Sequence, residues 1–285
     1  MRITKIQPKQ NNNSVKYKSI YMPKFGAHYD NGRIKELVGD GLIYRSGHIH
    51  NYSCLLRDFR LFLEIPEILK EKFPNGVKIY DYCCSAGYEP VSIVLGLFNS
   101  FSKEKVNDYT PIIARDNNPD IIRKAREYKL ILEQDEIRRL SFFENINPKD
   151  FLTAKRIDIH EQRNFDYTKD LKEKIHYETA DIFKDLESGK LSNEPCVLFI
   201  RNMWQYLTSQ GVAKLSYNLY SGLAPKSMVI IGSHDIENQA DKALIRAGFN
   251  KMKGDYNIDF KDRLLQAKYE DSKYWYQTND FCFEK

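Results

Sequence analysis

The chain has 285 residues, a formal net charge of +5, 42% hydrophobic residues and 29% charged residues. This length suits one large domain or two small ones, and the apolar content is enough for a sizeable core. Because Lys and Arg are interleaved with Asp and Glu, the charge favours a mixed, solvated surface and disfavours a nucleic-acid-binding face. The five Cys form no Cys-x-x-Cys pair, which disfavours a metal site and favours a reducing compartment.

The N-terminal region is polar. Residues 1–18 lack the apolar segment of a signal peptide, and no apolar run approaches the roughly 18 residues of a membrane span. We therefore expect a cytoplasmic protein without membrane insertion. Residues 1–45 are expected to form an extension, partly disordered or with one short helix near Arg33–Val38. Residues 46–285 are expected to form the main domain.

A helical pattern over residues 51–73 opens this domain, and Pro66 is expected to break or restart the helix. Strands and helices then alternate, which predicts an α/β fold with a doubly wound, mostly parallel sheet. The expected strands are Val77–Tyr82, Pro111–Arg115, Ile175–Glu178, Cys196–Ile200 and Ser227–Gly232, and the expected helices are Pro90–Phe101, Pro119–Glu127, Gln134–Leu140, Ser209–Gly222 and Asn238–Ala247. Near the C-terminus, Lys273–Gln277 and Asp280–Glu284 predict an antiparallel edge pair.

Residues 148–174 interrupt this alternation. The segment is charged, weakly patterned and lies between the second and third expected strands. A loop of this length inside a compact domain usually carries function or a small structure of its own. We expect an inserted hairpin or small subdomain there.

The most informative segment is Asp81–Ser92, which joins the first expected strand to the first crossover helix. Its small residues let the backbone approach a ligand, and the N–H groups at a helix start can face that ligand. The segment lacks the glycine patterns of dinucleotide and phosphate loops, and Glu89 would repel a phosphate. A nucleoside ligand with a positive centre and no phosphate fits better, and S-adenosylmethionine is such a ligand.

Four segments follow patterns that occur together in one enzyme family. Cys84–Ser92 is similar to Cys-Ser-[Ser/Thr/Ala]-Gly-Glu-Glu-Pro-Tyr-Ser, with Tyr88 in place of the first Glu. Asn51–Asp58 is similar to Asn-x-[Ser/Thr]-x-Phe-Phe-Arg-[Asp/Glu]. Ala114–Asn118 is similar to Ala-Thr-Asp-Ile-Asp, and Ile200–Leu207 to Cys-Arg-Asn-Val-x-Ile-Tyr-Phe. Together they resemble the CheR type of chemotaxis-receptor methyltransferases.

The resemblance implies a seven-stranded class I, Rossmann-like methyltransferase sheet with an antiparallel edge strand. It implies S-adenosylmethionine as the cofactor, S-adenosylhomocysteine as the product, and methyl transfer to a carboxylate oxygen of a protein glutamate. The partner would then be an acceptor protein, such as a receptor cytoplasmic domain, or a small-molecule acceptor. From the cysteine pattern we expect no metal.

The resemblance also implies roles for individual residues. Glu89 would pair with the cofactor ammonium, Asp116 would accept hydrogen bonds from the ribose, and Asp181 from the adenine amino group. Asn202 would bind the methionine part through its amide. Further cofactor contacts are expected from Asn51, Ser53, Cys84, Ser85, Ala86, Gly87, Asn117, Ile182 and Met203.

Two residues are candidates for catalysis. Arg57 would hold a carboxylate of the cofactor or of the acceptor by a bidentate contact. Tyr206 would line the channel of methyl transfer, or would be a core Tyr with a solvated hydroxyl.

Several site residues also have structural interpretations. Glu89 would complement the dipole of a helix start, and Asp181 would cap a helix. Asp116 would be a loop residue, since Asn118 is the better cap for the helix at Pro119. Ser53 would cap the helix that follows it.

Other functions remain open from the residues. A class I methyltransferase acting on a small molecule or a non-receptor protein would carry the same cofactor motifs. A catalytically silent cofactor-binding or scaffold protein would explain Tyr88 and Asp181, which stand where the family has Glu and Asn. An NAD-dependent oxidoreductase is disfavoured because the pyrophosphate loop is missing.

Overall fold

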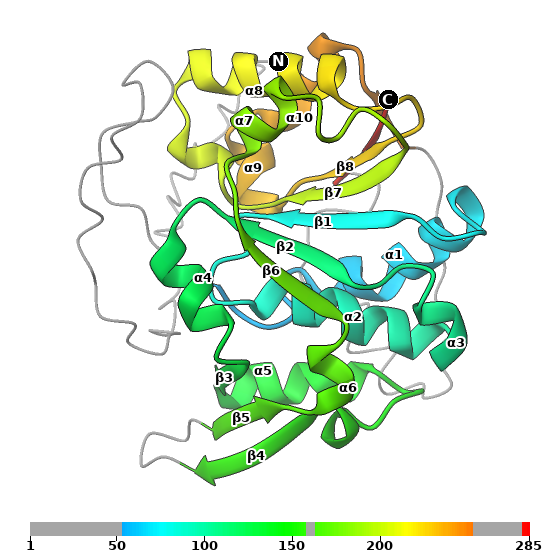
Figure 1. The fold of residues 1–285 in the computed structure, drawn as a ribbon, viewed down its shortest axis with the longest axis vertical. Helices are drawn as coiled ribbons and strands as arrows, with labels where there is room; N and C mark the ends of the chain where they lie inside the picture. Colours follow the sequence, from blue (N-terminus) through cyan, green and yellow to red (C-terminus); the bar gives the residue numbers. More distant parts are fainter. Residues whose placement is uncertain (1–52, 158–162, 253–280) are drawn as a thin grey trace, which may run out of the picture.

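The computed structural model describes residues 53–157, 163–252 and 281–285. Three predictions lie outside these residues: the short helix near Arg33–Val38, the strand Lys273–Gln277, and the position of Asn51. Within the described residues, no helix is long and apolar enough to cross a membrane. Figure 1 shows a large central sheet with helices on both faces and a small second sheet at one end.

The central sheet has seven strands in the order β6-β2-β1-β7-β8-β10-β9. The first five run parallel, and β10 is antiparallel to both of its neighbours. This confirms the predicted α/β class and its antiparallel edge strand. The strands are β1 (Lys78–Tyr82), β2 (Ile112–Asp116), β6 (Ile175–Thr179), β7 (Cys196–Ile200), β8 (Met228–Ile230), β9 (Asn250–Lys251) and β10 (Cys282–Glu284).

The order of strands reverses between β1 and β7, which are direct neighbours. Successive strands proceed outward on one side through β2 and β6 and on the other side through β8. Ligands bind in doubly wound sheets outside the carboxyl ends of the strands at such a reversal. The turns that follow β1 and β7 are therefore the expected position of a site.

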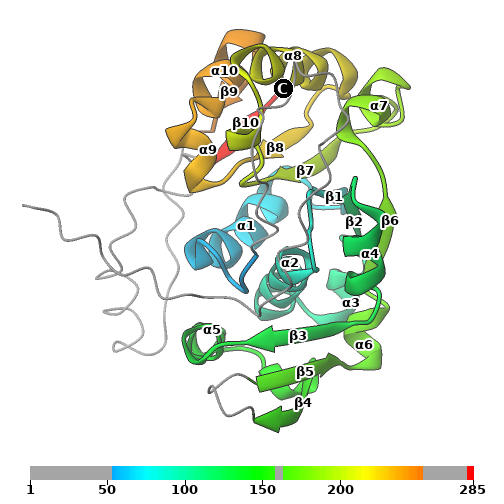
Figure 2. The same ribbon diagram turned by 90° about the vertical axis from the view of Figure 1, so that its left-hand side faces the viewer.

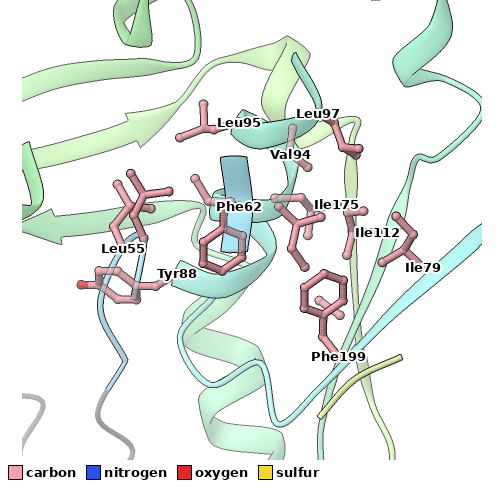
Figure 3. Close-up of a cluster of buried hydrophobic side chains, with 14 of the residues drawn as sticks. Leu55, Phe62, Ile79, Tyr88, Val94, Leu95, Leu97, Ile112, Ile175 and Phe199 are labelled. Carbon is pink, nitrogen blue, oxygen red and sulfur yellow. The ribbon is translucent and has the colours of Figure 1, made fainter. Parts of the chain in front are cut away.

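Helices cover both faces of this sheet and enclose two buried hydrophobic clusters. Helices α1 (Phe59–Lys72), α2 (Tyr88–Ser100) and α4 (Pro119–Ala125) contribute to the first cluster, part of which is drawn in Figure 3. Helices α7 (Ile182–Glu187), α8 (Ser209–Gly222) and α10 (Ala240–Ala247) contribute to the second. Strand β7 is buried over its whole length, as expected for a central strand covered on both sides.

Helix α1 continues through Pro66, so the predicted break is wrong. A proline inside a helix leaves the carbonyl four residues earlier, here that of Phe62, without its helical N–H partner. The Phe62 carbonyl lies against Gly96 of α2, where an added Cβ would be 2.3 Å from the oxygen. Gly96 thus leaves room for this carbonyl where α1 packs on α2.

A second, three-stranded antiparallel sheet lies below α2 in Figure 2. Strands β4 (Leu152–Ile157) and β5 (Arg163–Tyr167) form a hairpin, and β3 (Lys129–Leu132) pairs with β5. The sequence analysis assigned no strand at β3. Leu130 and Leu132 lie in the first hydrophobic cluster, whereas Ile131 between them is only half-buried. The strand pairs with β5 more than thirty residues further along the chain.

The remaining helices are short and connect these layers. They are α3 (Lys103–Val106), α5 (Gln134–Arg139), α6 (Lys169–Lys172), α9 (Ser233–Glu237) and three 3₁₀ turns, η1 (Leu140–Phe142), η2 (Pro148–Asp150) and η3 (Trp204–Tyr206).

Candidate functional site

The turn after β1 folds through residues with positive φ. Cys83 and Ser85 have φ values of 64° and 50°, and Gly87 has 94°. The Gly87 N–H donates to the Cys84 carbonyl over 3.1 Å, which closes the turn directly before α2 begins. Left-handed conformations cost non-glycine residues about 1–2 kcal/mol, and such strain gathers at ligand sites. This local geometry supports the prediction that the turn approaches a ligand.

Gly87 is the position in this turn where only glycine fits. An added Cβ would lie 2.3 Å from the hydroxyl of Tyr177 and 3.2 Å from that of Tyr167. The Tyr167 hydroxyl donates to the Gly87 carbonyl over 3.3 Å. Strand β6 and the small sheet therefore both pack against the back of the turn.

Asp116, the last residue of β2, connects to this turn. Its Oδ2 accepts from the Ser85 N–H over 3.1 Å, and its Oδ1 accepts from the Asn118 N–H over 3.0 Å. Burial raises the pKa of Asp116, while the backbone N–H donors oppose that rise. Asn118 caps α4, as predicted, with its Oδ1 accepting from the N–H groups of Asp120 and Ile121. Asp116 is thus held in place at the predicted ribose position.

Glu89 lies in the first turn of α2, with its side chain only 14% exposed. Its Oε2 is 3.1 Å from Nη1 of Arg201, which follows β7 and is fully buried. Burial raises the pKa of Glu89, and Arg201 and Arg57 counteract that rise. The other oxygen, Oε1, is buried without a hydrogen-bond partner in the described part of the chain.

Asn202 follows Arg201 in a left-handed conformation, with φ 59°. Its N–H donates to Oδ2 of Asp235 over 2.5 Å, and the same carboxylate accepts from the N–H groups of Gly232 and Trp204 over 2.8 and 3.1 Å. Burial raises the pKa of Asp235 to about 7, although these three donors lower it. An added Cβ on Gly232 would lie 2.7 Å from Asn202 Oδ1, so this glycine leaves room for the amide.

The other predicted cofactor residues follow neighbouring strands at the same edge. Asp181 follows β6 and caps α7, accepting from the Lys184 N–H over 3.1 Å. Ile182 and Met203 are buried in the second hydrophobic cluster, whereas Asn117 is exposed. Cys84 and Ala86 are buried on the inner side of the β1 turn.

Arg57 belongs to a non-helical segment that is anchored at four successive residues. The N–H groups of Leu55 and Leu56 donate to Glu136 Oε1 over 2.6 Å and to Ser92 Oγ over 2.8 Å. The carbonyl of Arg57 accepts from Arg201 Nη2 over 3.1 Å, and Asp58 binds the same nitrogen over 2.7 Å. The backbone that carries Arg57 is therefore held in place by Arg201.

Helix α1 begins only after this segment. Asp58, not Ser53, occupies the position before its first residue, so the predicted capping role of Ser53 is wrong. Ser53 and the Arg57 side chain are half-buried. Tyr206 lies in η3 after β7, half-buried and packed against the second hydrophobic cluster.

Tyr88 points away from this edge. It is 3% exposed and belongs to the first hydrophobic cluster together with Leu55, as Figure 3 shows. Its hydroxyl donates to the Ile131 carbonyl over 2.9 Å. The departure from the family pattern at this position therefore changes the packing between α2 and β3.

Three residues at this edge were not assigned a role from the sequence: Asp58, Arg201 and Asp235. Asp58 and Arg201 stand inside two of the four family patterns, which was a signal for both. For Asp235, the signal was its position three residues after Gly232, where a carboxylate reaches back to the N–H at a helix start.

The buried polar atoms at this edge fit a cofactor that carries an ammonium group. Glu89 Oε1, Asp81 Oδ2 and Asn202 Oδ1 are buried without a hydrogen-bond partner among the described residues. Buried polar atoms are seldom left unpaired, so each points to a bound group. These three oxygens are acceptors, which suits N–H donors on a ligand. Nε and Nη1 of Arg201 lie at the same edge and are buried donors without a hydrogen-bond partner among the described residues.

A family model described as CheR methyltransferase, SAM binding domain, matches residues 56–250, which is more than half of the chain. The chain belongs to the CheR methyltransferase family. It is therefore an S-adenosylmethionine-dependent methyltransferase with a class I sheet, as predicted from the sequence. No curated protein matches the chain.

The chain is also similar to solved methyltransferase structures at low identity. One is a TehB-like SAM-dependent methyltransferase from Corynebacterium glutamicum ATCC 13032 Kitasato (14% identity, 65% of this chain and 72% of that chain covered, TM-score 0.34). Another is the CurJ carbon methyltransferase (13% identity, 67% and 47% covered, TM-score 0.39). A third is the methyltransferase domain of bacterial-CtHen1-C (11% identity, 68% and 86% covered, TM-score 0.38). The chain thus spans about half the length of the CurJ structure and most of the other two.

Proposed function

We propose that this CheR-family methyltransferase transfers a methyl group to a carboxylate oxygen, with a protein glutamate as the acceptor. The observation that supports this proposal is the position of Arg57. Its carbonyl accepts a hydrogen bond from Arg201, and its positive charge lowers the pKa of the Glu89 carboxyl. A guanidinium that acts on Glu89 in this way suits bidentate binding of a second carboxylate.

The reaction places few demands on the protein. S-adenosylmethionine supplies an activated methyl carbon on its sulfonium, so the residues mainly align the acceptor and exclude water. A carboxylate acceptor is ionised at pH 7 and needs no general base. Within the proposal, Glu89 and Asn202 hold the methionine part, Asp116 the ribose and Asp181 the adenine, while Arg57 orients the acceptor and Tyr206 lines its path.

The test is transfer of tritiated methyl from S-adenosylmethionine to a purified chemoreceptor cytoplasmic domain and, in parallel, to a total cell lysate. Carboxyl methyl esters release volatile methanol in mild base, whereas N-methyl and C-methyl groups do not. Base-labile label on protein would support the proposal. Base-stable label, or label on small molecules only, would favour another acceptor, and tight cofactor binding without any label would favour a silent binding protein.

Arg57→Lys separates the two roles considered for Arg57. Lys keeps the charge but loses the planar bidentate geometry. If Arg57 binds the acceptor, the variant lowers kcat/KM for the acceptor and leaves the affinity for S-adenosylhomocysteine unchanged. If it binds the cofactor carboxylate, that affinity falls as well. Arg123→Lys on the exposed face of α4 is the matched control.

A further inference from the structure

A buried chain of charged and polar groups connects the start of α1 to the cofactor site. Ser233 Oγ lies 3.3 and 3.4 Å from the two carboxylate oxygens of Asp58 and donates to them. Asp58 Oδ2 accepts from Arg201 Nη2 over 2.7 Å. Arg201 Nη1 forms an ion pair with Glu89 Oε2 at 3.1 Å, without the geometry of a hydrogen bond. The chain ends at Glu89 Oε1, which has no hydrogen-bond partner in the described part of the protein.

Arg201 is held so that it has one orientation. Its side chain is fully buried, and its guanidinium lies over the ring of Phe62 at 5.1 Å from the centroid. Nη2 is shared between Asp58 and the Arg57 carbonyl. A planar guanidinium fixed on one side by a carboxylate presents its other nitrogen in a defined direction.

Asp58 adopts a conformation that costs energy. Its φ of 56° is left-handed, and Leu56 two residues earlier has φ 55°. Residues in this region persist where the surrounding contacts require them, and they gather at ligand sites. For Asp58 the required contact is the ion pair with Arg201.

We propose that Asp58 and Arg201 are positioning residues for cofactor binding. Asp58 fixes Arg201, and the ion pair between Arg201 and one oxygen of Glu89 keeps Oε1 directed at the ammonium group of the cofactor's methionine part. Without Asp58, Arg201 turns more fully toward Glu89 and occupies both oxygens. The inference rests on the assignment of Glu89 to the ammonium.

Two ligands distinguish positioning from general structural support. S-adenosylhomocysteine carries the amino-acid part, whereas 5′-methylthioadenosine has the same adenine, ribose and thioether without it. Calorimetric titration of the full chain with each ligand shows whether a variant affects binding of the amino-acid part or of the nucleoside part. Asp58→Asn is expected to lower the affinity for S-adenosylhomocysteine by about tenfold, the scale of a charge-assisted contact. The affinity for 5′-methylthioadenosine should change by no more than about twofold.

Glu64→Gln is the matched control, because Glu64 is also a buried carboxylate of α1 in an ion pair, here with Arg60 at 2.7 Å. It should change neither affinity. Arg201→Lys keeps the buried positive charge and should show the same selective loss as Asp58→Asn. Thermal unfolding shows whether Asp58→Asn is folded. If it is not, Arg201→Lys tests the same positioning role. In the double variant with Glu89→Gln, Asp58→Asn should produce no further loss.

If Asp58→Asn and Arg201→Lys lower the affinities for both ligands equally, or lower neither, the positioning role of Asp58 and Arg201 is wrong. If the unaltered protein binds 5′-methylthioadenosine but gains nothing from the amino-acid part, the assignment of Glu89 fails instead. If it binds neither ligand, the cofactor site itself is misplaced.

Discussion

The hydroxyl of Tyr88 forms hydrogen bonds with both the carbonyl and the N–H of Ile131. It donates to the carbonyl over 2.9 Å and lies 3.3 Å from the N–H, which donates back to it. Tyr88 therefore replaces the family's first acidic residue with a contact between α2 and the small sheet. The second acidic residue of the pattern, Glu89, is present, and we propose that it binds the cofactor ammonium.

Tyr88→Phe is expected to lower stability without affecting the cofactor. Removing the hydroxyl leaves the Ile131 groups without this partner, at a cost of about 1–2 kcal/mol in the free energy of unfolding. The affinity for S-adenosylhomocysteine should stay within about twofold, since the side chain faces the core. Urea unfolding and calorimetry measure the two quantities. A tenfold loss of affinity at unchanged stability would place Tyr88 in the site.

Gly87→Ala is expected to destabilise the protein strongly. The added Cβ would lie 2.3 Å from the Tyr177 hydroxyl at a residue whose φ is +94°. Gly189→Ala is the control, because Gly189 also has a positive φ (+72°) but its nearest atom would be 3.5 Å away. The control should cost about 1 kcal/mol, and Gly87→Ala about 2–3 kcal/mol or more, with loss of cofactor binding. If urea unfolding gives the same loss of stability for both variants, Tyr177 and Tyr167 move aside for the added Cβ.

Asp116→Ala is expected to lower the affinities for S-adenosylhomocysteine and 5′-methylthioadenosine alike, by about tenfold or more, because both ligands contain the ribose. It also removes the acceptor of the Ser85 N–H, which loosens the β1 turn. Asp120→Ala, an exposed carboxylate in the first turn of α4, is the control for lost charge. Calorimetry with both ligands makes the comparison. A loss confined to S-adenosylhomocysteine would contradict the ribose role.

Glu136 is expected to make stability depend on pH. It accepts from the N–H groups of Leu55 and Glu133, and burial raises its pKa to about 7 despite these bonds. A carboxyl with a higher pKa in the folded state keeps its proton up to a higher pH there than in the unfolded chain. The folded protein then binds more protons than the unfolded chain between about pH 4.5 and 7, and its stability falls as pH rises through this window.

Glu136→Gln removes this titration. The stability of the unaltered protein minus that of the variant should fall with rising pH, by at most about 1.4 kcal/mol per pH unit, between about pH 4.5 and 7. Urea unfolding at several pH values measures it, with the exposed Asp135→Asn as control. A difference that is constant, or that grows with pH, would contradict the shifted pKa.

The architecture was largely predictable because its signals are local. Apolar runs such as Cys196–Ile200 alternate with helical patterns, and this alternation was sufficient for the parallel sheet. The antiparallel strand was predicted from the C-terminal segment Asp280–Glu284. The cap at Asn118 was equally local. Strand β3 was not predictable, because its partner β5 lies more than thirty residues further along the chain. The continuation of α1 through Pro66 was not predictable either, because the space for the Phe62 carbonyl is left by Gly96 on another helix.

The same distinction applies to the site. The sequence placed Glu89, Asp116, Asp181 and Asn202 after strands whose carboxyl ends meet at one edge. It did not indicate that Tyr88 turns into the core, because that orientation follows from a hydrogen bond to β3. Nor did it indicate the ion pair between Asp58 and Arg201, which are 143 residues apart in the chain.

A crystal structure of the protein with S-adenosylhomocysteine tests the central claim most directly. The account predicts the amino nitrogen within hydrogen-bonding distance of Glu89 Oε1 and the ribose hydroxyls on Asp116, with Arg201 still between Asp58 and Glu89. A ligand bound at another edge of the sheet, or one whose amino group does not contact Glu89, would contradict it.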